Sequence, residues 1–291
     1  MDKNARRELI LQATACAERV RMKCGIARTA AVDPILVAEK RDCEVRFLAI
    51  PSLEGVYSPN PRAVIVLGSQ RPAGRRSFTC AHELGHYEFK HGTRIEELNA
   101  GQVQTFNDPD EFLAEMFAAF LLMSQGCVRR AFKDREIQPQ SVEPIQIFKL
   151  ACYLGVGYST LIDHITWTLN LLLPKQRENL LRTQPKVIKA LFGGLPQSEV
   201  VIVDCHWRDR AIDLEIGDTL VLDKDVIVED NSRLVPNEGI DNYQTLKATS
   251  KGYIRAYNKK NDWAVNIRVA SKHYEGLARY RFLDDPEEET Q

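Results

Sequence analysis

Two histidines four positions apart, with a glutamate directly after the first, are the residues that most clearly suggest chemistry in this chain. They lie in the stretch TCAHELGHYEFKHG, residues 79–92. On a helix, residues i and i+4 share one face, so His82 and His86 can present their imidazoles to a single metal ion. Glu83 is offset from that pair and can reach the water that attacks a peptide carbonyl. The pattern indicates a zinc-dependent peptidase.

A third ligand is expected downstream, because a hydrolytic zinc centre uses three protein ligands and keeps one position open. The segment NDPDEFLAEMFAAF, residues 107–120, carries Glu111 and Glu115 one helical turn apart. We expect Glu111 to bind the metal. Glu115 can accept a hydrogen bond from a ligand histidine, as carboxylates behind metal ligands do. The alternative for either glutamate is an exposed surface charge.

Other residues of the histidine stretch are expected to be structural. Gly85 would relieve crowding where another backbone approaches, and Cys80 is expected to be a small buried side chain rather than a zinc ligand. His91 stands five positions after His86 and does not share its helical face, so it is expected to cap the helix end. A position near the metal is the alternative for His91. The other histidines stand singly and are also read as structural: His164, His206 and His273.

The surrounding residues predict the elements that must position this stretch. Helices are expected over 5–26, over 32–42, from about 77 through the histidines, and over 111–124, with strands over 43–50 and 62–68. Asp33 can cap the second of these helices, and Pro34 suits its first position. Residues 51–61 and 93–110 are rich in turn-forming or polar residues, so we expect loops there.

Residues 139–182 again have a helical pattern. Within them, residues 145–173 show two helices separated by a short turn, which is typical of a helix-turn-helix. The second helix, after Gly157, carries no lysine or arginine before Lys175. Phosphate contacts dominate DNA affinity, so we expect this unit to pack structurally rather than to bind DNA.

From about residue 197 the chain changes to short strand-like runs such as DTLVLD and WAVNIRVA. The predicted fold class is therefore α+β: a mainly helical domain with a small β-sheet, followed by a C-terminal all-β domain of sandwich or barrel type. The predicted division is a peptidase domain over 1–138, a helix-turn-helix-like extension over 139–192, the β domain over 197–285, and a disordered acidic tail over 286–291.

Composition argues against several other classes of protein. The 291 residues include 39 Lys+Arg and 40 Asp+Glu, a net charge of −1, whereas dedicated nucleic-acid binders are usually basic. The seven cysteines form no Cys-x-x-Cys pair, which favours reduced thiols. We expect no signal peptide and no membrane span, because the first residues lack an apolar core and no apolar run approaches about 18 residues. A cytoplasmic location is expected.

Three segments together resemble the ImmA/IrrE-type metallopeptidase family. They are RRSFTCAHELGHYEFKH, the preceding LEGVYSPNPRAVIVL and the following DEFLAEMFAAFLLMS, and the similarity runs from about residue 10 to 170. The resemblance implies zinc ligands at His82, His86 and Glu111, with Glu83 as the general base. The sequence departs from the family at Glu115, where asparagine or aspartate is usual, and at Ser124, where proline is common.

The resemblance also implies a kind of partner. Members of the family often cleave or regulate a helix-turn-helix repressor, which would here be a separate chain. The region from about residue 197 is not part of the shared core, and it shows no catalytic pattern.

Two functions are therefore weighed. The first is a zinc-dependent endopeptidase that cleaves a protein substrate, which could lie along the edge of the strand RAVIVLG. Another divalent metal could replace Zn²⁺ in this site. The alternative is a non-catalytic regulator that binds protein or DNA and keeps the peptidase fold. A degenerated binder would be expected to have lost Glu83, so its presence favours the enzyme. The sequence does not indicate an oligomeric state.

Overall fold

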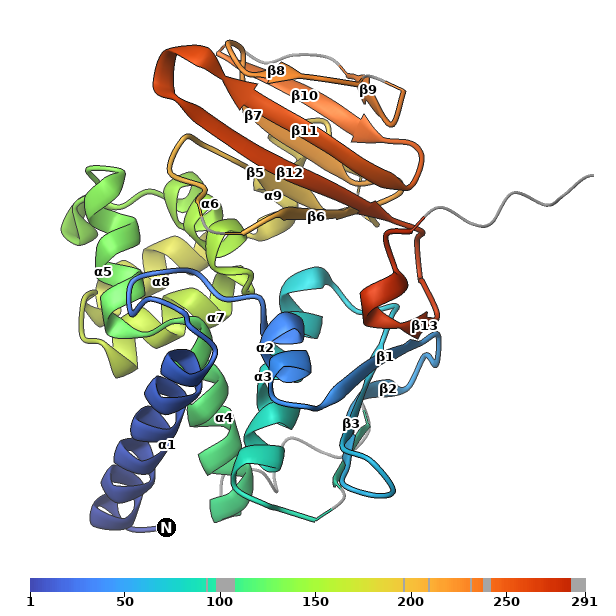
Figure 1. The fold of residues 1–291 in the computed structure, drawn as a ribbon. Coiled ribbons are helices and arrows are strands. Elements are labelled where there is room, and N and C mark those ends of the chain that lie inside the picture. Colours follow the sequence, from blue (N-terminus) through green and yellow to red (C-terminus); the bar gives the residue numbers. More distant parts are fainter. Residues whose placement is uncertain are drawn as a thin grey trace, which may run out of the picture.

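The computed structural model describes residues 1–92, 94–97, 108–195, 197–208, 210–230, 232–237 and 242–283. Its helices are α1 (Lys3–Lys23), α2 (Pro34–Lys40), α3 (Ala73–Glu88), α4 (Pro109–Leu122), α5 (Gln125–Asp134), α6 (Pro144–Leu154), α7 (Tyr158–Asp163), α8 (Pro174–Arg182) and α9 (Pro185–Leu191). Its strands are β1 (Glu44–Leu48), β2 (Leu53–Ser58), β3 (Val64–Gly68), β4 (Arg94–Glu97), β5 (Val200–Ile202), β6 (Ile212–Glu215), β7 (Thr219–Asp223), β8 (Ile227–Val228), β9 (Leu234–Pro236), β10 (Tyr243–Ala248), β11 (Gly252–Asn258), β12 (Trp263–Ala270) and β13 (Gly276–Leu277). The fold class is α+β, as the sequence predicts (Figure 1).

The first sheet has the order β13-β1-β3-β2-β4. Strands β1 and β3 are parallel, and the other neighbouring strands are antiparallel. Strand β13 comes from the far end of the chain, and Figure 1 shows it returning to the edge of this sheet beside β1. Because β3 lies between β1 and β2, the prediction that its edge receives an extended substrate is wrong.

Two segments predicted as loops contribute strands to this sheet. Strand β2 lies within the turn-rich residues 51–61, where Gly55 and the flanking prolines weaken the strand signal. Pairing with β3 on one side and β4 on the other satisfies the backbone groups of β2 and overrides that local preference. Strand β4 lies within the predicted loop over 93–110; residues 93 and 98–107 of that loop lie outside the described residues.

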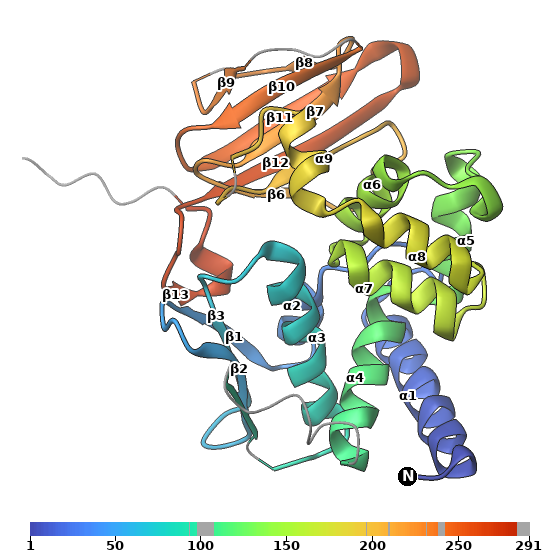
Figure 2. The ribbon, with the colours of Figure 1, turned by 180° about the vertical axis from the view of Figure 1, so that it is seen from behind.

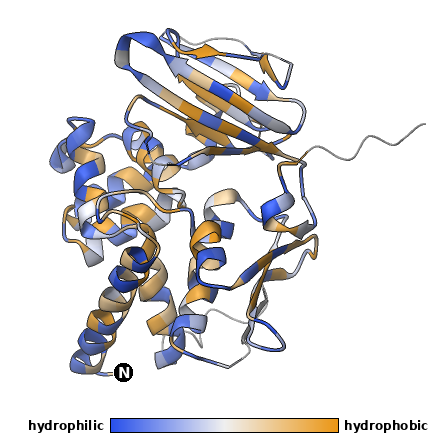
Figure 3. Cartoon of the chain, in the orientation of Figure 1, coloured by the Kyte–Doolittle hydropathy of each residue, from blue (hydrophilic) through white to orange (hydrophobic). Residues whose placement is uncertain are grey.

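Helices α3, α4 and α1 are stacked outward from the sheet. Helix α3 packs on β2 and β3, α4 packs against α3, and α1 packs against α4. Figures 1 and 2 show α1 and α4 side by side from opposite directions. The apolar character of α4 extends around much of its surface because it lies between two other helices, where Leu113, Phe117 and Leu121 are buried. Figure 3 shows hydrophobic residues gathered along this interior.

The predicted helix starts are confirmed at α2 and corrected at α3. Asp33 caps α2, its carboxylate accepting hydrogen bonds from the amides of Ile35 and Leu36, with Pro34 in the first turn. Helix α3 begins at Ala73, four residues before the predicted start. Its N-cap is Pro72, which follows the turn after β3 and has φ −53° and ψ 145°.

The segment Pro109–Asp134 is apolar and long enough, by composition, to cross a membrane. However, 61% of its apolar window is buried inside the protein. Helix α4, which forms the first part of this segment, contacts both α1 and α3 and is the central helix of a packed core. The burial pattern therefore accounts for its hydropathy.

The two helices of the predicted helix-turn-helix are α6 and the helix from Tyr158 to Thr168, which ends in a π-helical turn. Their axes are bent by 101°. Gly155 ends α6 in the left-handed conformation, with φ 68°. The second helix buries Leu161, Ile162 and Ile165 in the hydrophobic core. This packing is what the absence of basic residues led us to expect.

The C-terminal region is rich in strands, as predicted. Its described residues form two four-stranded sheets, with orders β5-β7-β10-β9 and β6-β12-β11-β8. Arg268 of β12 connects this region to the N-terminal part, because its guanidinium pairs with Asp213 of β6 at 2.6 Å and with Asp33 of the α2 cap at 3.3 Å. The acidic tail over 286–291 lies outside the described residues.

The seven cysteines, all of them within the described part of the chain, are unpaired thiols.

Candidate metal centre

A close contact between α3 and α4 brings the predicted site together. A Cβ atom on Gly85 would lie 3.0 Å from the Cα of Ala114 and 3.1 Å from Cδ1 of Phe117. The absence of a side chain at Gly85 therefore lets the two helix backbones approach, as predicted for this position. As a result, the first turn of α4 lies beside the last two turns of α3.

The three predicted metal ligands meet at this contact. His82 Nε2 and His86 Nε2 lie 3.0 Å apart, and Oε2 of Glu111 lies 3.3 Å from the first and 3.6 Å from the second. A tetrahedral zinc site with bonds of about 2.0 to 2.2 Å would separate neighbouring ligand atoms by about 3.3 to 3.6 Å. Two imidazole nitrogens and one carboxylate oxygen at this spacing could hold a divalent metal ion.

The electrostatics of the cluster keep Glu111 ionised. Hydrogen bonds from His82 and then His86 lower the pKa of its carboxyl well below the usual range, and burial acts in the opposite direction. Asp108 caps α4, its carboxylate accepting from the amide of Asp110, so Glu111 stands in the first turn. His86 is fully buried and His82 nearly so. Deprotonated Glu111 is the form that binds a cation.

Glu83 lies on a different side of α3, against the sheet. Successive helical residues are rotated by about 100°, so Glu83 is turned away from His82 and toward β2. Its side chain is fully buried, and a Cβ atom added to Gly55 would lie 3.0 Å from Glu83 Oε1. The same position would clash with the methyl group of Thr79, one turn earlier. Gly55 therefore provides the space in which the Glu83 carboxylate sits.

His91 is the site residue that the helical-face argument missed. Helix α3 ends at Glu88, and Lys90 takes a left-handed conformation with φ 59°. The amide of Lys90 bonds to the carbonyl of Tyr87, and that of His91 bonds to the carbonyl of His86. These two bonds form a Schellman motif, which folds the chain back over the last turn. Since the motif has no glycine here, the sequence offers little signal of it.

The reversal places the His91 ring beside the proposed ligands. Its Nδ1 lies 2.8 Å from Nδ1 of His86, and its Nε2 lies 3.4 Å from Oδ1 of Asp110. His91 is therefore positioned to form the hydrogen bond that orients the ring of a metal-binding histidine, here His86. Glu115 is exposed on α4, and its role behind the ligands stays a prediction.

Cys80 is completely buried, as predicted. Burial raises the pKa of its thiol well above the ordinary value, which favours the neutral form. A neutral buried thiol is a poor metal ligand and packs as a small apolar group.

Comparison with known proteins supports the family resemblance. Residues 38–165 match the family model Peptidase_M78, described as an IrrE N-terminal-like domain. No curated protein matches the chain. The matched residues run from the end of α2 to the π-helical turn after α7, and they include His82, Glu83, His86 and Glu111; helix α1 and the C-terminal sheets lie outside the match. Residues 38–165 of this chain are therefore similar to the IrrE N-terminal-like domain, in agreement with the resemblance seen in the sequence.

Proposed function

We propose that this chain is a zinc-dependent endopeptidase whose metal ligands are His82, His86 and Glu111. The observation that carries the proposal is the 3.0 to 3.6 Å spacing of their three ligand atoms, with the Glu83 carboxylate on the neighbouring face of α3. The family match supports peptidase chemistry at this site. Zinc is the ion that best fits two imidazoles and one carboxylate, although other divalent ions accept the same donors.

The division of labour follows from the positions of the side chains. A divalent ion supplies Lewis acidity at such a site, polarising the scissile carbonyl and making water more acidic. Glu83 is the proton carrier: its carboxylate accepts a proton from the attacking water and passes it to the leaving nitrogen. The Glu83 carboxylate lies against Gly55 of β2, so its position is set before substrate binds.

The substrate backbone is proposed to lie along β4. Among the described residues β4 is the terminal strand of the first sheet, beyond β2, and β2 carries Gly55 next to Glu83. An extended peptide can add to such a strand through main-chain hydrogen bonds. This placement replaces the edge of β3, which is occupied on both sides.

The proposed substrate is a protein, with a separate repressor of the helix-turn-helix type as the first candidate. This choice rests on the family resemblance. Cytoplasmic action on such a repressor fits the unpaired thiols of all seven cysteines.

The function is tested by co-expressing the chain with repressor-like proteins encoded by neighbouring genes. Wild type is expected to produce a cleavage product, and Glu83→Gln is expected to reduce the rate by about 10² to 10⁴-fold, the usual contribution of a general base. Because Glu83 is not among the proposed ligands, the variant should retain zinc by elemental analysis. Glu18→Gln, an exposed change on α1, is the matched control. Cleavage by Glu83→Gln at the wild-type rate would contradict the mechanism.

A further inference from the structure

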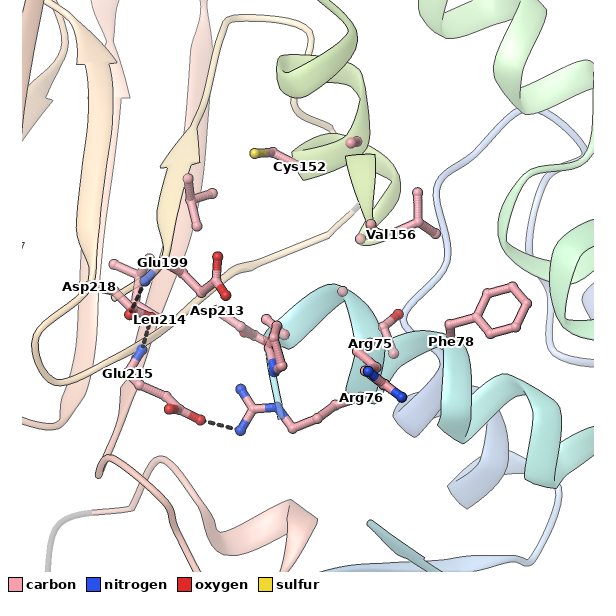
Figure 4. Close-up of a pocket in the computed structure, with 18 of the residues that line it drawn as sticks. Arg75, Arg76, Phe78, Cys152, Val156, Glu199, Asp213, Leu214, Glu215 and Asp218 are labelled. Carbon is pink, nitrogen blue, oxygen red and sulfur yellow. Dashed lines mark hydrogen bonds and ion pairs between the residues drawn. The ribbon is translucent and has the colours of Figure 1, made fainter. Parts of the chain in front are cut away.

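A cavity lies between the N-terminal half and the C-terminal sheets, away from the histidine cluster. Its volume is about 750 Å³, within the usual range of about 300 to 1,000 Å³ for small-molecule sites. Figure 4 shows it between the first turns of α3, the end of α6 and the strands β5 and β6. His82, His86 and Glu111 do not line it. The cavity therefore needs an explanation separate from the proposed metal centre.

The walls combine aromatic rings with charged groups. Aromatic surface comes from Phe47, Phe78, Phe148, Tyr158 and Trp207. Most of the charged side chains are already neutralised by partners: Arg75 by Glu54 at 2.7 Å, Arg76 by Glu215, Lys189 by Glu199 at 2.5 Å, Arg281 by Asp213 at 3.1 Å, and Asp33 by Arg268 at 3.3 Å. Such pairs leave little net charge for a ligand to meet.

Two charged residues of the lining have no oppositely charged partner among the described residues. Asp218 accepts hydrogen bonds from the amides of Glu199 and Glu215, at 2.9 and 2.8 Å, so backbone donors satisfy its oxygens. Arg210 forms no ion pair within the described chain. Its Nη1 donates to the carbonyl of Tyr153 at 3.0 Å, and its guanidinium lies over the Trp207 ring, 5.4 Å from the centroid.

The Arg210 guanidinium has unused binding capacity. Its Nε is buried and has no hydrogen-bond partner among the described residues. An unsatisfied N–H of a charged group inside a protein is unfavourable, and an anionic oxygen is its strongest partner. Arg210 Nη1 and Ser77 Oγ also lie 2.9 and 3.5 Å from the point where a Cβ on Gly155 would stand. A cation and a hydroxyl thus meet at one corner of the cavity.

We propose that this cavity binds a small organic anion with an aromatic or other planar apolar body. The anionic group, a carboxylate or a phosphate, pairs with Arg210, and the apolar body packs among the aromatic side chains. Ser77 and Phe78 belong to α3, so the bound molecule contacts the helix that carries His82, Glu83 and His86. The binding site does not depend on the peptidase activity.

The first experiment measures charge selectivity with the full chain. Anilinonaphthalene sulfonate, an aromatic anion that fluoresces in apolar surroundings, is expected to bind saturably. Benzoate should displace it, whereas benzylamine, of similar size and opposite charge, should not. Displacement is also measured with inorganic phosphate. Displacement by phosphate alone would indicate a site for free phosphate, whereas displacement by benzoate but not by phosphate would indicate that the ligand needs an aromatic body. Absence of saturable binding, or equal displacement by benzoate and benzylamine, would overturn the proposal.

The second experiment locates the bound anion. Arg210→Gln is expected to weaken binding of the fluorescent anion at least tenfold, whereas Arg208→Gln, an exposed change outside the cavity, should leave it unchanged. Equal affinities of the two variants would refute the role of Arg210. If Arg210→Gln does not fold, amide hydrogen exchange of the wild type can be compared with and without the fluorescent anion. Slower exchange at 73–79 and 155–157 with the probe supports the site, and protection confined to other segments rejects it.

Discussion

His91 Nδ1 lies 2.8 Å from His86 Nδ1, and the two ring centroids are 5.0 Å apart. Only one of two facing nitrogens can carry the proton of a neutral hydrogen bond. If His86 offers Nε2 to a metal, its proton sits on Nδ1 and His91 Nδ1 accepts it. His91 then carries its own proton on Nε2, which faces Oδ1 of Asp110 at 3.4 Å. This arrangement fixes both the ring orientation and the tautomer of His86.

Removing His91 is therefore expected to weaken metal binding. His91→Phe keeps a ring of similar size but no acceptor for His86, and loss of such a partner typically costs about 10 to 100-fold in metal affinity. Competition with a zinc chelator measures the change. His91→Gln, which retains an acceptor, should recover part of the affinity. His273→Asn is the control, because His273 is exposed and also has positive φ, which asparagine tolerates. Unchanged zinc affinity in His91→Phe would show that the contact does not orient His86.

A methyl group at Gly55 is expected to impair catalysis more than metal binding. In Gly55→Ala the new Cβ would stand 3.0 Å from Glu83 Oε1 and would overlap Thr79, so either Glu83 or β2 must shift. We expect the rate of cleavage to fall at least tenfold while zinc content is retained, with a loss of stability of about 1 to 3 kcal/mol from overpacking. Gly92→Ala is the matched control, since a Cβ there meets nothing within 4 Å. Full activity of Gly55→Ala would mean that Glu83 is not confined by β2.

Two buried groups should give opposite contributions to stability between pH 4 and 6.5. Burial lowers the pKa of His164 to about 4 from 6.5, although its ring bonds to the carbonyl of Met123. The unfolded chain therefore binds more protons at this group, and the stability it contributes is lost as pH falls. Burial raises the pKa of Asp218 to about 6 from 3.8. There the folded chain binds more protons, so stability is gained as pH falls through 6.

Variants at these positions separate the two contributions. In His164→Leu only the Asp218 contribution remains, and the free energy of unfolding should rise, relative to wild type, as pH falls from 6.5 to 4. In Asp218→Asn the change relative to wild type should have the opposite sign. Each pKa shift corresponds to a change of about 3 kcal/mol in the free energy of unfolding over its full pH range. Urea unfolding of the metal-free proteins at pH 4.5, 5.5 and 7 measures both slopes. Parallel pH profiles for the two variants would contradict the assignments.

Local spacing determined a large part of the candidate site. The i, i+4 relation placed His82 and His86 on one face of α3, and the offset of Glu83 followed from the same helical geometry. Asp33 and Pro34 predicted the start of α2 because capping is a short-range interaction. The prediction that another backbone approaches closely at Gly85 is confirmed, although the sequence did not identify α4 as that backbone.

Other relationships were decided only by the tertiary structure, because they join segments that are not neighbours in a single helix or strand. Strand β2 was hidden by Gly55 and nearby prolines, and it forms because β3 and β4 pair with it on both sides. His91 reaches His86 only because the chain reverses at Lys90. The sequence predicted that Glu111 binds the metal together with the two histidines, because a carboxylate is a usual zinc ligand. That its oxygen lies 3.3 Å from His82 depends on how closely α3 and α4 pack, which is a property of the assembled core.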